Sequence, residues 1–263
     1  MTTKIIKIIR KFTIEQWSII DKEYIKFKSD LKCIGSIILI IFLIVIQRYY
    51  GQPRFFTNIF GDLLANFPLP TIWSRLYTTF ACSILYLIAP YIYIRLIFNE
   101  RLKDFGWTLK GIAKYKWLYI AIILVVLPLV VLVSFSKSFS EHYPLYQDAG
   151  NSLLSLILWE LSYGLYFVII EFFFRGFMVF SLAKYIGSLS IFVMDIPYVM
   201  IHFGKPTAET IGSIIAGITL GTLSLRTRSI FGGIIIHITI AYGMDIMALI
   251  QKGQLMQIFT RWI

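Results

Sequence analysis

Seven runs of mostly apolar residues limit what this chain can fold into more than any other feature of its sequence. They lie at about 31–50, 77–97, 117–135, 153–183, 187–203, 210–225 and 229–251. A helix needs about 20 such residues to cross the hydrocarbon core of a bilayer. The fifth and sixth runs are short and interrupted by proline or glycine, and the fourth is too long for one straight span. The pattern predicts an all-α, polytopic membrane helical bundle with about seven transmembrane helices, within a range of six to eight.

The composition excludes most soluble classes of protein. Only 15% of the 263 residues are charged and 58% are hydrophobic, whereas soluble domains have roughly 25% charged and 45–50% apolar residues. The net charge of +11 would suggest nucleic acid as the partner of a soluble protein. In a membrane protein it is expected from the Lys/Arg bias of cytoplasmic loops and from attraction to anionic lipid. We therefore expect membrane lipid, and no nucleic acid, as a partner.

The basic residues also predict the orientation of the chain. With the N-terminus in the cytoplasm, 17 Lys and Arg residues fall on the cytoplasmic side and seven on the other side, and Arg175 lies inside a span. This asymmetry predicts an integral membrane protein with its N-terminus inside and its C-terminus outside.

The ends and loops divide the chain further. Residues 1–30 alternate isoleucines and aromatics with Lys and Arg at roughly helical spacing, which indicates either an amphipathic interfacial helix or a basic leader that only fixes topology. Loops 51–76 and 136–152 are the best candidates for external loops, and 252–263 form a C-terminal tail. Cys33 and Cys82 both lie in apolar runs, so we expect neither a disulfide nor a cysteine metal site.

Ionisable residues inside the spans all belong to the C-terminal half. Such a residue costs several kcal/mol unless it faces a partner or a water cavity. They are Glu160, Glu171, Arg175, Asp195, His202, His237 and Asp245. The spans before residue 150 have essentially none at their centres. We therefore expect residues 31–150 to be a scaffold and residues 151–251 to be the working core.

Helical spacing groups these residues into stripes. Glu171 and Arg175 are four residues apart and can pair on one helix face. His202 follows Asp195 by seven residues, and Asp245 follows His237 by eight. Each residue also has a structural interpretation, since a Glu–Arg pair can clamp a helix and a buried His or Asp can tie helices together. The coincidence of a buried Glu with two buried His residues favours a functional centre.

Three blocks carry a resemblance to a known family. They are EFFFRGF at 171–177, YVMIHFGKP at 198–206 and IIIHITIAYGMD at 234–245. In this order they resemble the CAAX prenyl protease/Abi (CPBP) family of intramembrane endopeptidases, with its E-x-x-x-R, F-x-x-x-H and H-x-x-x-N/D-like elements. The resemblance covers roughly residues 150–250, and it identifies 151–251 as a CAAX protease/Abi-like catalytic core. It implies a buried water cavity surrounded by a Glu and two His residues, and it favours a bacterial plasma membrane.

The family residues transfer position by position. Glu171 and Arg175 match the Glu and Arg of the first motif. Tyr198 stands where the family usually has Phe, and His202 matches the histidine of that second motif. His237 matches the histidine of the third motif.

Two positions depart from the family pattern. Ile170 stands where the family usually has the first of two adjacent glutamates, which is taken as its general base. Ala241 stands where Asn or Asp usually follows the third-motif histidine by four residues, and the nearest acid is Asp245. Either Glu171 and Asp245 have taken over these roles or the site is no longer a competent protease.

The resemblance implies a hydrolase that cleaves a peptide bond of a lipidated or membrane-embedded substrate. Glu171, held charged by Arg175, would be the general base, and His202 would orient the water or protonate the leaving amine. His237, with Asp245 as its orienter, would donate to the oxyanion.

Two other functions remain open. A catalytically impaired member could act as a membrane binding, immunity or regulatory protein, and Ile170 and Ala241 favour that alternative. A small transporter could use the buried acids as a proton relay, but the sequence has no evident inverted repeat and its charges cluster in one half.

No cofactor is expected. Two His and one carboxylate, here Glu171, His202 and His237, can bind zinc with an open position. Their spacing is not that of an H-E-x-x-H helix, and they come from three separate helices, so a metal-free site is favoured.

Overall fold

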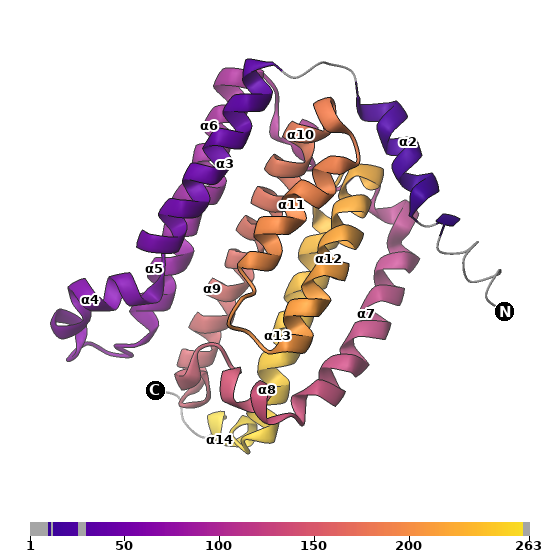
Figure 1. Cartoon of the computed structure of the whole chain (residues 1–263). Coiled ribbons are helices and arrows are strands. Elements are labelled where there is room, and N and C mark those ends of the chain that lie inside the picture. Colours follow the sequence, from indigo (N-terminus) through magenta and orange to yellow (C-terminus); the bar gives the residue numbers. More distant parts are fainter. Residues whose placement is uncertain (1–9, 12, 26–29, 260–263) are drawn as a thin grey trace. The chain divides into compact units, whose positions relative to one another are not determined.

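The computed structural model describes residues 10–11, 13–25 and 30–259. The rest of the expected N-terminal segment (1–9, 12 and 26–29) and residues 260–263 of the expected tail lie outside the described residues. Within the described part of the chain, every regular element is a helix (Figure 1). The predicted all-α membrane bundle is confirmed.

Among the described residues, six helical stretches are long and apolar enough to cross a membrane. They are Leu31–Leu64, Ile72–Phe98, Ile112–Ser134, Leu153–Ile186, Thr207–Thr227 and Phe231–Gln251. The fifth predicted run corresponds to a shorter apolar helix, α11 (Leu189–Met200), of 12 residues. At 1.5 Å per residue this helix is about 18 Å long, less than the hydrocarbon thickness of about 30 Å. The fifth run, which proline and glycine interrupt, is therefore shorter as a helix than the sequence predicted.

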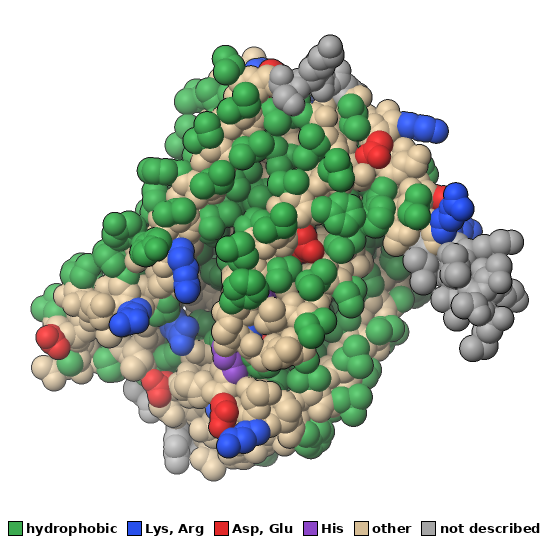
Figure 2. All heavy atoms as spheres, viewed as in Figure 1, with side chains coloured by type: hydrophobic (Ala, Val, Ile, Leu, Met, Phe, Trp, Pro, Cys, Tyr) green, Lys and Arg blue, Asp and Glu red, His purple; other side chains and the backbone are tan. Residues whose placement is uncertain are grey.

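The outer surface of the spans is apolar. Leu96, Leu124 and Leu132 have 74%, 67% and 69% of their surface exposed. Hydrophobic side chains cover most of the face shown in Figure 2, and charged ones are scattered among them. A soluble protein rarely exposes so large a contiguous apolar surface, whereas lipid acyl chains cover it without cost. The protein is an integral membrane protein.

The chain forms two compact units whose segments alternate along the sequence. The first comprises Met1–Ile41, Pro90–Tyr115 and Glu171–Gly233, and the second comprises Phe42–Ala89, Lys116–Ile170 and Ile234–Ile263. Some helices contribute to both units, and these are α3 (Leu31–Tyr50), α6 (Ala89–Tyr93), α7 (Ile112–Ser134), α9 (Leu153–Glu171) and α13 (Phe231–Gln251).

Elements of the first unit pack mainly around α11. These elements are α2 (Ile14–Tyr24), η2 (Ile94–Phe98), η3 (Leu102–Phe105), η5 (Phe172–Met178), α10 (Val179–Ile186), α11 and α12 (Thr207–Thr227). Helix α11 packs against α10, α12 and η5. The first and second sequence motifs, 171–177 and 198–206, therefore lie in this unit, and the third, 234–245, lies in the second unit.

Helix α2, the described part of the N-terminal segment, packs on the same unit. Its Trp17 Nε1 donates to Thr222 Oγ1 at 3.2 Å, and its Ile20 is fully buried. The carboxylate of Asp21 accepts a bond of 2.7 Å from the backbone N–H of Ser188, immediately before α11. One face of the expected amphipathic helix is therefore bound to protein.

The second unit contains the segments that were expected to be external loops. Its elements include α4 (Pro53–Leu64), α5 (Ile72–Cys82), η1 (Ser83–Ile88), α8 (Lys137–His142), η4 (Gln147–Gly150) and α14 (Leu255–Ile258). Both expected loops hold helices: α4 lies within 51–76, and α8 and η4 lie within 136–152.

Three helical segments have π geometry, and two of them flank a proline. Pro90 lies in α6, between η1 and η2. Proline lacks an N–H and its ring clashes with the carbonyl four residues earlier, so the wider turn beside it lets the helix continue. The third, η5, follows Glu171 and makes Leu153–Ile186 one continuous helix with a widened turn. Single π turns occur often at functional sites.

The topology generates a first prediction. If α11 counts as a crossing, the chain passes the membrane seven times and its ends lie on opposite sides. We expect a fluorescent protein to be active at the N-terminus and alkaline phosphatase to be active at the C-terminus of matched bacterial fusions. Fluorescence from fusions at both ends would show that only six helices cross.

Candidate functional site

A buried ion pair lies at the start of η5. Arg175 Nη1 is 3.0 Å from Glu171 Oε1, and both side chains are completely buried. The spacing of four residues places them on one helix face. Because an isolated charge in the hydrocarbon costs several kcal/mol, each side chain makes the burial of the other tolerable. The pairing expected from the sequence is present.

The aromatic ring of Tyr198 covers the guanidinium of Arg175. The guanidinium carbon is 3.7 Å from the ring centroid, and Tyr198 is 1% exposed. Phe174 packs edge-on against the same ring at 5.5 Å. A desolvated cation over an aromatic face is worth about 2 kcal/mol or more. The tyrosine that departs from the second family motif thus makes a direct contact with the first motif.

Two glycines make room for the carboxylates of this cluster. A Cβ atom at Gly233 would overlap Oε2 of Glu171, and one at Gly217 would overlap Oδ1 of Asp195. Asp195 is 7% exposed, and its Oδ1 has no hydrogen-bond partner among the described residues. It lies one helical turn before Tyr198 on α11. Asp195 therefore places a second carboxylate in the cluster that holds Arg175.

His202 joins this cluster through Tyr198. Its Nδ1 lies 2.8 Å from the backbone carbonyl of Tyr198, and the two rings pack at 4.8 Å. A carbonyl can only accept a hydrogen bond, so Nδ1 carries the proton and Nε2 of the neutral ring carries the lone pair. The first unit thus brings Glu171, Arg175 and His202 together around one tyrosine.

His237 and Asp245 belong to the second unit. The ring of His237 stacks on Phe167 with centroids 4.9 Å apart. Asp245 is completely buried, and its Oδ2 accepts a hydrogen bond of 2.6 Å from Nε1 of Trp159. Eight helical residues separate His237 from Asp245 by about 12 Å along the axis. The structure thus gives Asp245 an indole partner that the sequence did not predict.

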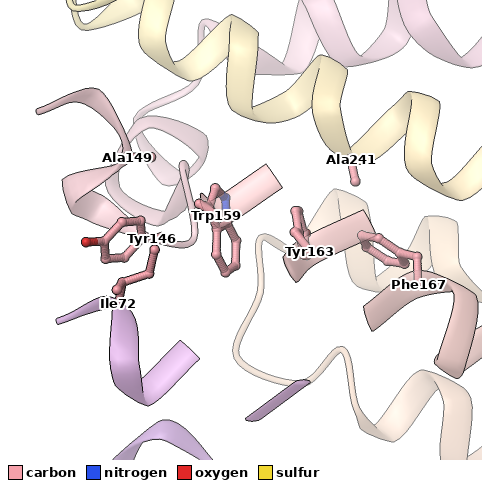
Figure 3. Packing of buried hydrophobic residues seen from close by; sticks show 7 residues of the cluster. All are labelled: Ile72, Tyr146, Ala149, Trp159, Tyr163, Phe167 and Ala241. Carbon is pink, nitrogen blue, oxygen red and sulfur yellow. The ribbon is translucent and has the colours of Figure 1, made fainter. Parts of the chain in front are cut away.

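Three aromatic rings on α9 form a row, which Figure 3 shows. The row lies between the contacts of Asp245 and of His237. Trp159, Tyr163 and Phe167 are spaced by four residues on α9, and successive ring centroids are 4.6 Å apart. The row thus runs from the partner of Asp245 to the ring that stacks on His237. Ala241 packs into the same cluster and is 3% exposed. An apolar environment surrounds the position where the family usually has Asn or Asp.

The guanidinium of Arg75 lies near one end of this aromatic row. Its guanidinium carbon lies 6.0 Å from the Trp159 ring centroid, and its Nη2 donates to the Leu145 carbonyl at 2.5 Å. Arg75, which was expected on the external side, therefore contacts both the 136–152 segment and the Trp159 ring.

A protein metal site needs several His, Cys, Asp or Glu side chains close together. Among the residues that the structure describes, no group of three or more His, Cys, Asp or Glu side chains is arranged to hold a metal ion.

Several residues of these clusters escaped the sequence analysis. Trp159 is 86 positions from Asp245 in the sequence, so no local spacing connects them. Gly217 belongs to the small-residue run GSIIAGITLG, whose usual interpretation is close helix packing. Its role beside Asp195 depends on which helix α12 contacts.

Comparison with known proteins finds one family model that matches the part of the chain containing the first two motifs. Residues 151–243 match the family model of type II CAAX prenyl endopeptidases, Rce1-like. The match includes Glu171, Arg175, His202 and His237 and ends before Asp245. No curated protein and no solved structure matches the chain significantly. The resemblance predicted from the three motifs is confirmed.

The buried ion pair generates a second prediction. Arg175→Met leaves the Glu171 carboxylate without its cation, and removing one partner of a buried pair typically costs about 3–5 kcal/mol. We expect a lower melting temperature of the detergent-purified protein. The double variant Glu171→Gln/Arg175→Met should recover much of this loss because the carboxylate that faced Arg175 is removed together with it. A double variant less stable than Arg175→Met would contradict this account.

Proposed function

We propose that this protein, whose residues 151–243 match the Rce1-like endopeptidases, hydrolyses a peptide bond of a lipidated or membrane-embedded substrate. The buried Glu171–Arg175 pair, joined to His202 through Tyr198, is the observation that carries the proposal. Carboxylate and imidazole groups, such as those of Glu171 and His202 in this cluster, are well suited to activating water. The apolar surface of the spans fits a substrate that arrives through the lipid.

Glu171 is the general base in this proposal. Its Oε1 faces Arg175, which favours the charged form of the carboxylate, and its Oε2 lies beside Gly233. We assign Oε2 the transfer of a proton from the attacking water. The carboxylate of Asp195 also interacts with Arg175. Glu171 is therefore not the sole counter-ion of Arg175.

The two histidines have different roles. His202 presents the lone pair of Nε2, which orients the attacking water and, once protonated, can deliver the proton to the leaving amine. His237 donates a hydrogen bond to the oxygen that becomes negative in the transition state. Loss of one such donor typically costs about 10²–10³-fold in rate.

Asp245 acts as a positioning residue and not by direct contact with the reacting atoms. It fixes the indole of Trp159, and the stack through Tyr163 and Phe167 ends on His237. In this proposal Asp245 orients His237 through the row of aromatic rings on α9.

The third prediction tests proteolysis directly. Glu171→Gln should abolish new peptide termini that wild-type protein generates in membranes, with a fall of about 10²-fold or more expected for loss of a general base. Quantitative terminal proteomics at equal expression would measure this and name the substrate. Glu171→Asp keeps a negative charge near Arg175 but withdraws the carboxylate, so it separates catalysis from folding.

Glu100→Gln is the matched control. Glu100 pairs with Lys184 near the surface, and such pairs contribute about 0–1 kcal/mol. This variant should leave the pattern of termini unchanged. If wild-type, Glu171→Gln and Glu100→Gln membranes all yield the same termini while all three proteins remain folded, the peptidase proposal fails.

That outcome would favour a catalytically impaired relative that binds a membrane partner. A specific observation supports this second candidate. Ile170 is 2% exposed and Ala241 is 3% exposed, so both positions that lack the usual family acid are fully integrated into apolar packing. The first candidate remains preferred because Glu171 keeps its charge partner.

We also propose that the reaction needs no metal. The fourth prediction is that the rate at which termini appear in isolated membranes stays unchanged after prolonged treatment with 1,10-phenanthroline or EDTA. A loss of activity that added zinc restores would contradict this proposal.

A further inference from the structure

Helix α4 exposes an apolar face that the proposed reaction does not use. None of its 12 residues is buried. Ile59, Phe60 and Leu63 are 55%, 40% and 69% exposed. The helix begins at Pro53, three residues after α3 ends at Tyr50. Helix α4 occupies most of the first half of residues 51–76, the segment that was expected to be an external loop.

The sequence of α4 divides sharply into two halves. At 100° per residue, Phe56, Ile59, Phe60 and Leu63 fall on one side of the helix. Polar residues occupy the opposite side, and these are Arg54, Thr57, Asn58 and Asp62. A helix of this kind, with low overall hydrophobicity, typically lies in the interface of a bilayer.

Aromatic contacts hold α4 in a fixed orientation within the second unit. The rings of Phe55 and Phe56 pack on Tyr77 of α5 at 6.3 and 5.0 Å. Phe55 also packs on Tyr50 at 5.4 Å, and the hydroxyl of Tyr77 donates to the Tyr50 carbonyl at 2.6 Å. The exposed apolar side chains therefore face outward in a defined direction.

The length of α3 sets the level of α4 in the membrane. Its 20 residues rise about 30 Å, which equals the hydrocarbon thickness. Tyr49 and Tyr50 at its end are 70% and 56% exposed, and Trp73 at the start of α5 is 39% exposed. Tyr and Trp gather at the membrane–water interface. Helix α4 thus begins where the chain leaves the hydrocarbon.

We propose that α4 docks on the bilayer itself, with Ile59, Phe60 and Leu63 among the upper acyl chains and its polar half toward the headgroups and water. The lipid-facing side of α3 leads into this surface, since Phe42 and Val45 are 62% and 48% exposed. The partner is therefore lipid and not a second protein. The docking anchors the α3–α5 connection at the membrane surface.

Site-directed spin labelling tests this proposal. Both natural cysteines are buried, so a single new cysteine can be labelled in the otherwise unchanged full-length chain. Leu63→Cys probes the apolar half and Asn58→Cys is its matched control on the polar half. Ile84→Cys, an exposed position in a span, provides the lipid reference. The labelled proteins are placed in phosphatidylethanolamine–phosphatidylglycerol vesicles.

We expect the ratio of collisions with oxygen to collisions with a water-soluble nickel chelate to be several-fold higher at Leu63 than at Asn58, and closer to that at Ile84. Equal, water-like ratios at Leu63 and Asn58 would overturn the proposal. Protection of Leu63 from both reagents would also overturn it, because a protein would then cover the face. Neither result depends on proteolytic activity, so the proposed function can fail without affecting this test.

Discussion

The ion pair between Glu171 and Arg175 is the interaction on which the first unit depends. Two opposite charges without water contact are stable in a membrane only when they face each other and when their surroundings satisfy the remaining polar surface. Tyr198 covers Arg175 with its ring, and Gly233 leaves space for Glu171. One charge pair therefore depends on three segments of the first unit: the π turn of η5, the start of α13 and the middle of α11.

The second unit buries its acid in a different way. Helix α13, which carries Asp245, contains no Lys or Arg, and Asp245 accepts a hydrogen bond from the indole of Trp159. A neutral donor stabilises a carboxylate less than a cation does, and the guanidinium of Arg75 lies 6.0 Å from the centroid of the same indole. The aromatic row between Trp159 and His237 ties this polar group to a family histidine without any further charge.

The surroundings of Ile170 and Ala241 explain in physical terms why these two positions depart from the family pattern. Ile170 immediately precedes the ion pair, and a second glutamate there would add a negative charge that one arginine could not fully balance. Ala241 lies among Trp159, Tyr163 and Phe167, where a polar side chain would need a partner.

The sequence by itself determined the membrane class, the approximate spans, the Glu171–Arg175 pair and the family match. All of these depend on composition or on neighbours within one helix, and helical periodicity places such neighbours together. The structure alone decided that Tyr198 covers Arg175, that Gly217 makes room for Asp195 and that Trp159 binds Asp245. It also decided that α4 turns its apolar half outward. These contacts join residues distant in sequence, and their geometry follows from helix packing, which hydropathy and spacing do not encode.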